Sequence, residues 1–367
     1  MSLFGPIGCK RAYYYCGRCG RGLFPWDTIV GLTPKRLTPA AEEIVSLAGA
    51  LSQSFEEAAD KLLPKMTGIR LAETTVQRTT EAAGERLGRQ LQAGRVLGSR
   101  RDWSWHKDAH GRRCAYVSVD ATGVRQQAVD AGPAEGRMPY VGMVYNAVPE
   151  LAADSCHRPP PGTTMQARYL SGLYSLEELG LQMRRQAAQV GMEGAELWIG
   201  LSDGGNGLEH FLQANFPRDL VLILDFWHAA EYLADFAKLW YANDESEANR
   251  VFQEWSHILK HEGGRRMMEV LQSLPVPRKA LLKEKHQEVL NYFGNNLHRM
   301  NYPEYRANGW LIGSGAVESA CKTVVGQRLK LAGMRWREYG TDTICHLRAL
   351  HRSEYGQWDA FWQRSLN

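Results

Sequence analysis

The chain has 367 residues, of which 44% are hydrophobic and 23% charged, with a formal net charge of +4. This is the balance of an ordinary globular protein, and the length allows two or three domains, or one large domain with insertions. Because no apolar stretch is long enough to cross a membrane and the amino terminus lacks the apolar core of a signal peptide, we expect a cytoplasmic protein with no membrane partner.

Residues 1–33 form a small unit that is rich in aromatic residues and carries a cysteine pair. Cys16 and Cys19 are separated by two residues and followed by Gly20, which is the spacing of a zinc knuckle. A structural zinc ion takes four ligands, so this pair supplies half a site. The total of seven cysteines is odd and argues against a disulfide framework. Cys16 and Cys19 are therefore candidate zinc ligands that need partners.

Residues 36–110 are expected to form a helical domain. Its first helix begins at Thr38, a favourable N-cap, with Pro39 at the first helical position. Helical patterns continue over 54–66 and 72–91. The bundle carries polar side chains that a DNA-reading helix-turn-helix could use: Thr74, Thr75, Gln77 and Arg78. A DNA-binding domain and a plain packing domain both fit this pattern.

Basic residues are concentrated in two parts of the chain, 95–113 and 322–337, whereas residues 243–262 are rich in acids. A solvated helix face would explain either basic cluster by itself. Two such clusters on either side of a set of acidic residues favour a polyanionic partner.

From residue 111 the pattern changes to strands alternating with helices. Three extended segments in succession predict a meander. The order then continues as helix, buried strand, helix, buried strand and helix, over the ranges 175–191, 195–203, 207–216, 219–225 and 227–241. This predicts a mixed α/β sheet covered on both faces, in the element order of the ribonuclease H-like fold. We expect this core over 111–242, an all-helical insertion over 243–309, and the last helices of the core over 310–367.

Three acidic residues lie at the ends of predicted elements. Asp120 ends the first strand, Asp203 ends the fourth, and Glu318 lies near the start of a late helix. Each alone has a structural explanation: a turn former, an Asp-Gly turn or helix cap, and a favourable interaction with a helix dipole. Together they fall on elements that meet at one edge of a ribonuclease H-like sheet. Such carboxylates are the ligands that a pair of Mg²⁺ ions about 4 Å apart requires.

Several longer motifs span almost the whole chain: YYYCGRCGRGLFPWD, VSVDATG, SDGGNG, ILDFWHAAEYL and GSGAVESACKTVVGQRLKLAGMRW. On these motifs the chain resembles DDE-type insertion-sequence transposases, most closely the ISKra4 family. The resemblance implies an enzyme that cuts transposon ends and joins the freed 3′-OH to target DNA, using two divalent metal ions (Mg²⁺ or Mn²⁺) on a ribonuclease H-like core. It implies Asp120, Asp203 and Glu318 as the metal-binding triad. It also implies double-stranded DNA as partner, a homo-oligomer assembled on that DNA, and a location at the bacterial nucleoid.

The residues Asp225 and His228 form a second signature. They end the last predicted strand and resemble the D-x-x-H motif of Mutator-like and related transposases. The alternative is a capped helix start with a packed histidine. If the motif is functional, both side chains lie close to the triad and orient the reacting groups without being primary ligands.

The late basic cluster supplies the candidate DNA-binding residues. Lys322 follows Glu318 by one helical turn, so it contacts either a phosphate or Glu318 itself. The other candidates for the DNA backbone are Arg328, Lys330, Arg335, Trp336 and Arg337. Trp336 could stack on a flipped or frayed base, or it could anchor the hydrophobic core.

Two other functions compete with this interpretation. Related transposases carry a further cysteine pair upstream, which this sequence lacks, so a catalytically decayed, transposase-derived DNA-binding protein is one alternative. Such a protein binds DNA but does not cut it. A glycoside hydrolase with two catalytic carboxylates and tryptophan-lined subsites is another, since the chain has 11 Trp. It would work without metal, and the basic clusters argue against it.

Overall fold

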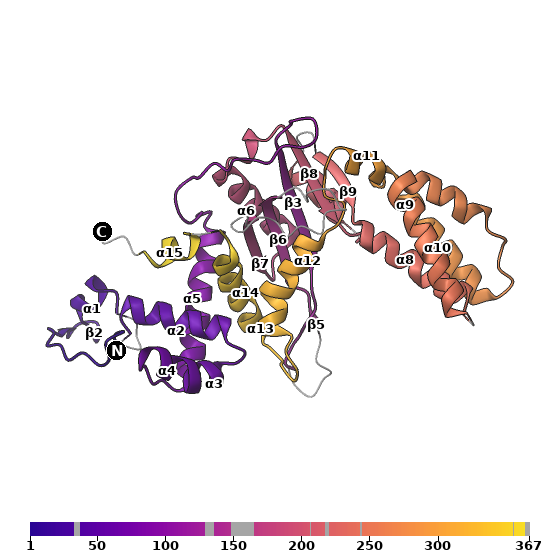
Figure 1. Ribbon diagram of the computed structural model, residues 1–367. Helices are drawn as coiled ribbons and strands as arrows, with labels where there is room; N and C mark the ends of the chain where they lie inside the picture. The colour runs from indigo at the N-terminus through magenta and orange to yellow at the C-terminus, as the bar shows by residue number, and fades with distance from the viewer. Residues whose placement is uncertain are drawn as a thin grey trace.

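The computed structural model describes residues 1–32, 37–128, 136–147, 165–205, 207–216, 220–242, 244–354 and 356–363. A twisted mixed sheet forms the centre of the molecule, with one group of helices from the first quarter of the chain and another from residues 226–307 on opposite sides of it (Figure 1). The fold is therefore α/β, as the sequence predicts. Among the residues described, no helix combines the length and apolar character needed to cross a membrane.

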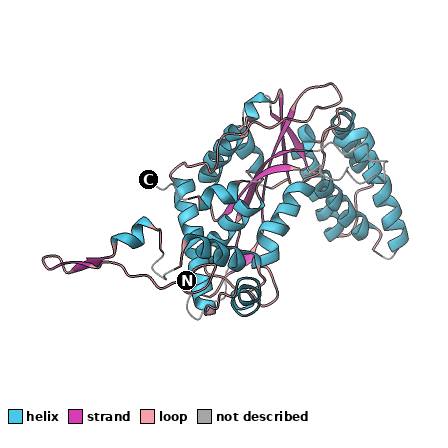
Figure 2. Ribbon diagram, turned by 60° about the vertical axis from the view of Figure 1, so that its left-hand side comes forward, coloured by secondary structure: helices cyan, strands magenta, loops and turns pink. Residues whose placement is uncertain are grey.

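The amino-terminal unit is a short hairpin followed by one helical turn. Strands β1 (Tyr14–Cys16) and β2 (Arg21–Leu23) pair antiparallel, and α1 (Pro25–Ile29) follows. All residues of both strands are exposed, and the hairpin extends away from the body of the protein (Figure 2).

The next unit is built of helices between residues 39 and 92, as predicted, whereas residues 93–110 of the predicted helical domain form no helix. Thr38 is the N-cap of the first helix: its side chain accepts a hydrogen bond from the backbone N–H of Ala41 at 3.4 Å, and Pro39 is the first helical residue. The elements are α2 (Pro39–Leu51), α3 (Phe55–Glu57), the π-helical turn η1 (Ala58–Leu62), α4 (Leu63–Thr67) and α5 (Glu73–Gln92). Helix α5 packs on α2 and also on α14 (Glu338–Arg352), which joins this unit to the end of the chain.

The central sheet has the strand order β7-β6-β3-β8-β9. Its strands are β3 (Cys114–Ala121), β6 (Tyr140–Asn146), β7 (Gln166–Gly172), β8 (Leu197–Ser202) and β9 (Leu220–Leu224). Strands β3, β6 and β7 pair antiparallel, which confirms the predicted meander. Strand β8 runs parallel to β3, and β9 runs parallel to β8. Two short strands, β4 (Val124–Arg125) and β5 (Gly136–Arg137), form a separate hairpin.

Parallel strands need a crossover, and the predicted helices supply it. Helix α6 (Leu176–Gln189) leads to β8 and starts with a capping box between Ser175 and Glu178. The 3₁₀ turn η2 (Met192–Gly194) and helix α7 (Leu208–Asn215) complete the connections, and α8 (Phe226–Trp240) leaves the sheet after β9.

Residues 245–307 are helical, as predicted for the insertion. They form α9 (Glu245–Ser273), α10 (Ala280–Asn296), the 3₁₀ turn η3 (Leu297–Arg299) and α11 (Tyr302–Ala307). Helix α9 breaks at Gly263, whose φ of 89° belongs to the left-handed region that favours glycine. Helices α8, α9 and α10 pack together around Phe236 and Trp255, whose rings stack at 5.7 Å.

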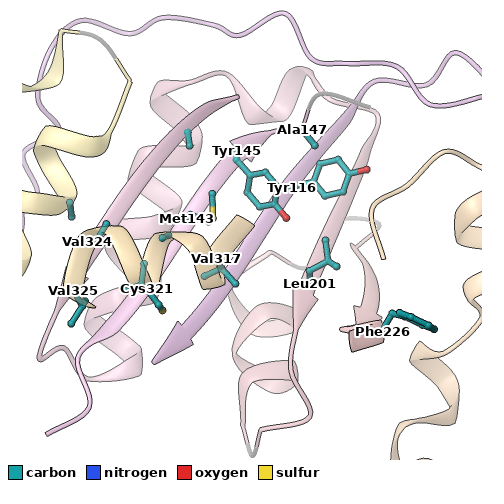
Figure 3. Packing of buried hydrophobic residues seen from close by; sticks show 14 of the residues in the cluster. Tyr116, Met143, Tyr145, Ala147, Leu201, Phe226, Val317, Cys321, Val324 and Val325 are labelled. Carbon is teal, nitrogen blue, oxygen red and sulfur yellow. The ribbon is translucent and has the colours of Figure 1, made fainter. Parts of the chain in front are cut away.

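The last part of the chain returns to the sheet. It comprises α12 (Gly315–Ala320), the π-helical turn η4 (Cys321–Gly326), α13 (Gln327–Leu329), α14 and α15 (Gln357–Trp362). Val317, Cys321 and Val324 belong to the buried cluster between this segment and the sheet, and Figure 3 shows them on the helix that crosses the strands near Met143 and Tyr145.

The two faces of β3 belong to two different cores, because successive side chains of a strand point to opposite sides. Tyr116 belongs to the core that includes α8, α9 and α12, whereas Val117 belongs to the core that includes α6, α7 and α15. Asp120 lies four residues after Tyr116, so it shares the face that α12 covers. The alternation of the strand thus decides which helices the carboxylate meets.

A buried histidine makes the stability of this fold depend on pH. His346 of α14 is 5% exposed, and burial lowers its pKa below the ordinary 6.5 despite the nearby carboxylate of Asp342, 3.5 Å away. The unfolded chain therefore takes up this proton first as the pH falls. We expect the free energy of unfolding to decrease below about pH 6.5, as measured by urea denaturation, and we expect His346→Gln to flatten this decrease. The exposed His110→Gln is the control, and an unchanged slope in His346→Gln would assign the effect to other groups.

Candidate active site

Three aspartates lie level with one another at the carboxyl ends of the parallel strands. Ser118 of β3 pairs with Leu201 of β8, so Asp120 and Asp203 each lie two residues beyond that pair. Ser202 pairs with Leu224 of β9, so Asp203 and Asp225 each lie one residue beyond that pair. The backbone N–H of Asp225 also donates to the carbonyl of Ser202 at 2.9 Å. The strand register therefore brings the predicted residues to one edge of the sheet.

Asp120 is held by its own strand and by the helix above it. One carboxylate oxygen accepts a hydrogen bond from the backbone N–H of Ala121 at 2.7 Å, and the other accepts from the thiol of Cys321 at 3.4 Å. Burial raises the pKa of Asp120, and the nearby charge of Asp203 raises it further. The negative charges of these two carboxylates therefore repel each other, and a bound cation would offset this repulsion.

Asp203 belongs to a tight loop that the helical insertion supports. Its carboxylate accepts a hydrogen bond from the backbone N–H of Gly205 at 2.9 Å. A Cβ atom at Gly204 would lie 2.6 Å from the ring of Tyr292 in α10, so only glycine lets this loop approach the helix so closely. Arg299 donates to the hydroxyl of Ser202 at 3.2 Å, which ties the end of β8 to the same insertion.

Glu318 is linked to Asp225 through a serine that the sequence patterns did not single out as functional. The hydroxyl of Ser314 contacts both carboxylates, that of Asp225 and, at 2.7 Å, that of Glu318. Ser314 precedes α12 as its N-cap residue, yet its side chain makes no capping bond, because it is turned toward the acids. The hydrogen bond from Ser314 lowers the pKa of Glu318, but burial and the carboxylates of Asp225 and Asp120 outweigh it and raise that pKa. The sequence signal was a serine four residues before Glu318, one helical turn away.

We expect Ser314→Ala to lower any activity of this site by about 10- to 100-fold, the usual cost of losing a side chain that orients a ligand. The reason is that Glu318 then loses the hydroxyl that fixes its carboxylate against buried Asp225. Ser319→Ala, an exposed serine on the same helix, is the matched control. The measurement is the reaction rate of Ser314→Ala beside that of Ser319→Ala. Equal rates for the two variants would show that Ser314 has only a packing role.

Asp225 and His228 have different environments, although both belong to the start of α8. Asp225 is 0% exposed and caps the helix by accepting from the backbone N–H of Trp227 at 2.7 Å. His228 is half-exposed and lies within electrostatic range of Asp120. Its Nδ1 atom is 3.9 Å from the carboxylate of Glu231. The alternative prediction of a capped helix start is therefore correct for Asp225. The same helix start places both side chains beside the predicted triad.

The chemistry of these donors fits divalent cations such as Mg²⁺. All four acids offer hard carboxylate oxygens. Burial is the main cause that raises the pKa values of Asp120 and Glu318, and neighbouring carboxylates raise them further, a repulsion that a cation would relieve. Among the residues that the structure describes, no three His, Cys, Asp or Glu side chains already converge on one point. The strand register brings Asp120 and Asp203 level, and helix α12 brings Glu318 over the same face of the sheet, so the three acids would have to draw closer together to share a cation.

Two of the predicted DNA-binding lysines lie beside the carboxylates. Lys322 and Lys330 line a cavity of about 340 Å³ together with Asp120, Glu318 and Cys321. The ammonium group of Lys330 donates to the hydroxyl of Thr122 at 2.8 Å, just after β3. Acidic and basic side chains therefore line the same cavity. Such a site can hold a phosphate, because the acids would bind cations and the lysines would contact phosphate oxygens directly.

Arg328 and Trp336 require a correction. Arg328 is 1% exposed; its guanidinium donates to the carbonyls of Gly49 and Gln53 and lies over the rings of Phe55 and Trp336. Trp336 is 8% exposed, so it anchors the core as the alternative interpretation held. Neither side chain is placed to bind a DNA backbone, because packing against Phe55 buries both. The charge pattern of the sequence therefore gave a wrong prediction for these two residues.

Arg335 and Arg337 remain exposed. They line a larger cavity of about 700 Å³ between the start of α5 and the segment before α14, together with Thr74, Gln77 and Arg78. Three of the four side chains considered for a helix-turn-helix reader thus line the same opening as two of the predicted phosphate contacts.

The cysteine pair is presented by the amino-terminal hairpin. Cys16 ends β1, Cys19 lies in the turn, and both thiols are exposed and free. Hydrogen bonds from the backbone and side chain of Cys19 lower the pKa of Cys16, which favours the thiolate form that binds zinc. The hairpin supplies two ligands, and Cys9, the nearest other cysteine in sequence, is also exposed.

Comparison of the chain with models of protein families and with curated proteins finds no match. The site is therefore interpreted from its own geometry and from the resemblance of its motifs.

Proposed function

We propose that this protein is a DDE-type DNA transposase of the ISKra4 kind, which cuts insertion-sequence ends and joins the 3′-OH to target DNA. The observation that carries the proposal is the level placement of Asp120, Asp203 and Asp225 at the ends of three adjacent parallel strands, with Glu318 on the helix that covers the same face. The strand order, third-second-first-fourth-fifth in chain sequence, is that expected of a ribonuclease H-like sheet, and it supports the proposal.

Asp120, Asp203 and Glu318 would hold two divalent metal ions, which when bound activate the attacking oxygen and stabilise the departing one. The chain itself orients these ligands. Asp225, buried and hydrogen-bonded to Ser314, would fix the position of Glu318 through that serine, and His228 lies within electrostatic range of Asp120. No covalent intermediate with the protein is needed for an in-line transfer.

The basic residues support a DNA partner. Lys322 and Lys330 would contact the phosphates beside the scissile bond, since they line the cavity that contains Asp120 and Glu318. Arg335 and Arg337 would contact the DNA backbone further away, at the second cavity. Cutting two transposon ends in one complex calls for a homo-oligomer on the DNA, acting at the nucleoid.

Zinc at the amino-terminal hairpin is a separate part of the proposal. Cys16 and Cys19 would supply two of its four ligands, and the site would have to be completed by other residues. The half site favours as second candidate a decayed transposase that binds DNA without cutting it.

The experiment that tests the proposal is a nicking and strand-transfer assay with the full chain on duplex DNA carrying the terminal repeats of its own element. Mg²⁺ or Mn²⁺ is added in one arm and a chelator in the other. Metal-dependent release of 3′-OH ends and joined products would support the transposase. Binding without cleavage would favour the decayed protein, and neither binding nor cleavage would reject both.

A further inference from the structure

Trp227 is an exposed aromatic side chain at the edge of the carboxylate site. It is 59% exposed, although its neighbours Asp225 and Phe226 are 0% and 2% exposed. Its backbone N–H donates to the Asp225 carboxylate at 2.7 Å, so this residue is fixed directly to the site. An indole left in water here is unusual, because large apolar side chains gain free energy from burial.

One side of the indole packs against the protein. Its ring meets the ring of Phe226 edge to face, with centroids 5.2 Å apart. It also covers Gly313: a Cβ atom there would lie 2.9 Å from Cδ1 and 3.1 Å from Nε1 of the indole, and 3.9 Å from the Asp225 carboxylate. Gly313 immediately precedes Ser314, which bonds Glu318. The fold therefore fixes a flat aromatic surface one residue away from the groups that position the acids.

We propose that the indole of Trp227 stacks on a nucleobase next to the scissile phosphate and holds the strand in register with the carboxylates. This inference rests on the proposed function. An exposed aromatic ring beside a phosphate-handling site is what base stacking uses. The ammonium group of Lys260 lies 5.9 Å from the ring of Phe226, the residue next to Trp227, and adds positive charge to this region.

The test compares Trp227→Leu, Trp227→Phe and Gly313→Ala with the wild-type full chain. The substrate is terminal-repeat duplex with 2-aminopurine next to the cleavage point. We expect binding to quench the fluorescence in the wild type and in Trp227→Phe, which keeps a stacking ring, but not in Trp227→Leu. Cleavage by Trp227→Leu should fall by about 10- to 100-fold, the equivalent of one lost stacked base. Gly313→Ala should also lower the rate of cleavage, because the added methyl group displaces the indole.

Two controls separate stacking from misfolding. Leu281→Ala removes another exposed apolar side chain, 65% exposed, at the far end of α10 from Tyr292, and should leave cleavage unchanged. A substrate with an abasic site in place of the stacked base should be cut at equal rates by the wild type and by Trp227→Leu, since there is nothing left to stack.

The outcomes distinguish the two proposals. If the wild type cuts DNA and Trp227→Leu cuts it equally fast, with equal quenching, the stacking inference is wrong and the transposase proposal stands. An indole that instead contacts a protein partner would also leave quenching unchanged and overturn the inference. If the wild type neither binds nor cuts the duplex, both proposals fail.

Discussion

Replacing any one of Asp120, Asp203 and Glu318 by its amide is expected to abolish metal-dependent DNA cleavage, with a fall of about 10³-fold or more. An amide keeps the size of the side chain but removes the negative charge that holds a divalent cation. Loss of one carboxylate would therefore weaken the binding of the divalent cations that the chemistry needs. The measurement is the rate of strand nicking on terminal-repeat duplex in Mg²⁺, for Asp120→Asn, Asp203→Asn and Glu318→Gln.

The matched control is Asp235→Asn, an exposed aspartate on α8 that lies away from the sheet edge. It should cut DNA at the wild-type rate. DNA binding in the absence of metal should survive in all the variants, because the lysines and arginines are unchanged. If the three amide variants retained cleavage, the carboxylates would not be the catalytic set, and the proposed mechanism would be wrong.

The largest effect on stability is expected from Arg348→Met. Arg348 is 2% exposed and donates to three backbone carbonyls, those of Val324, Ala50 and Thr323. It thereby fastens the π-helical turn after Glu318 to α14 and to the helical unit. Burial lowers its pKa to about 10, so it stays charged at neutral pH while it makes these bonds. Methionine fills much of the volume but leaves the carbonyls unpaired, which should cost about 3 kcal/mol or more.

The matched control for this prediction is Arg352→Met, one helical turn further along α14 and exposed. It should change the free energy of unfolding by less than about 0.5 kcal/mol. Urea denaturation followed by circular dichroism gives both values. A small loss in Arg348→Met would mean that water replaces the guanidinium at the three carbonyls.

Local patterns in the sequence were enough to predict the elements. The alternation before Asp120, the apolar run before Asp225 and the Thr38-Pro39 helix start each correspond to a strand or helix of the structure. These signals are local, because they depend on period and on caps within a few residues. The placement of the acids at strand ends followed from the same patterns, and the register then brought them level.

Contacts between distant segments could not be read from the sequence. The basic run that contains Arg328 and Trp336 looks like a DNA-binding surface, but packing against Phe55, more than 250 residues earlier in the chain, buries both. No sequence pattern indicated that the hydroxyl of Ser314 contacts Asp225, a buried residue 89 positions earlier in the chain. Nor did any sequence pattern indicate that the ring of Trp227 is 59% exposed while the neighbouring Phe226 is buried.

The sequence by itself determined the α/β class, the succession of strands along the chain, the three aspartates at strand ends and Glu318 near a helix start, because period, capping and turn chemistry act over short distances. Only the tertiary structure decided which side chains face those acids and which basic residues remain in solvent. The physical reason is that burial is a property of the whole packed chain. A guanidinium or an indole is placed inside or outside by neighbours that may be hundreds of residues away, and no local pattern encodes them.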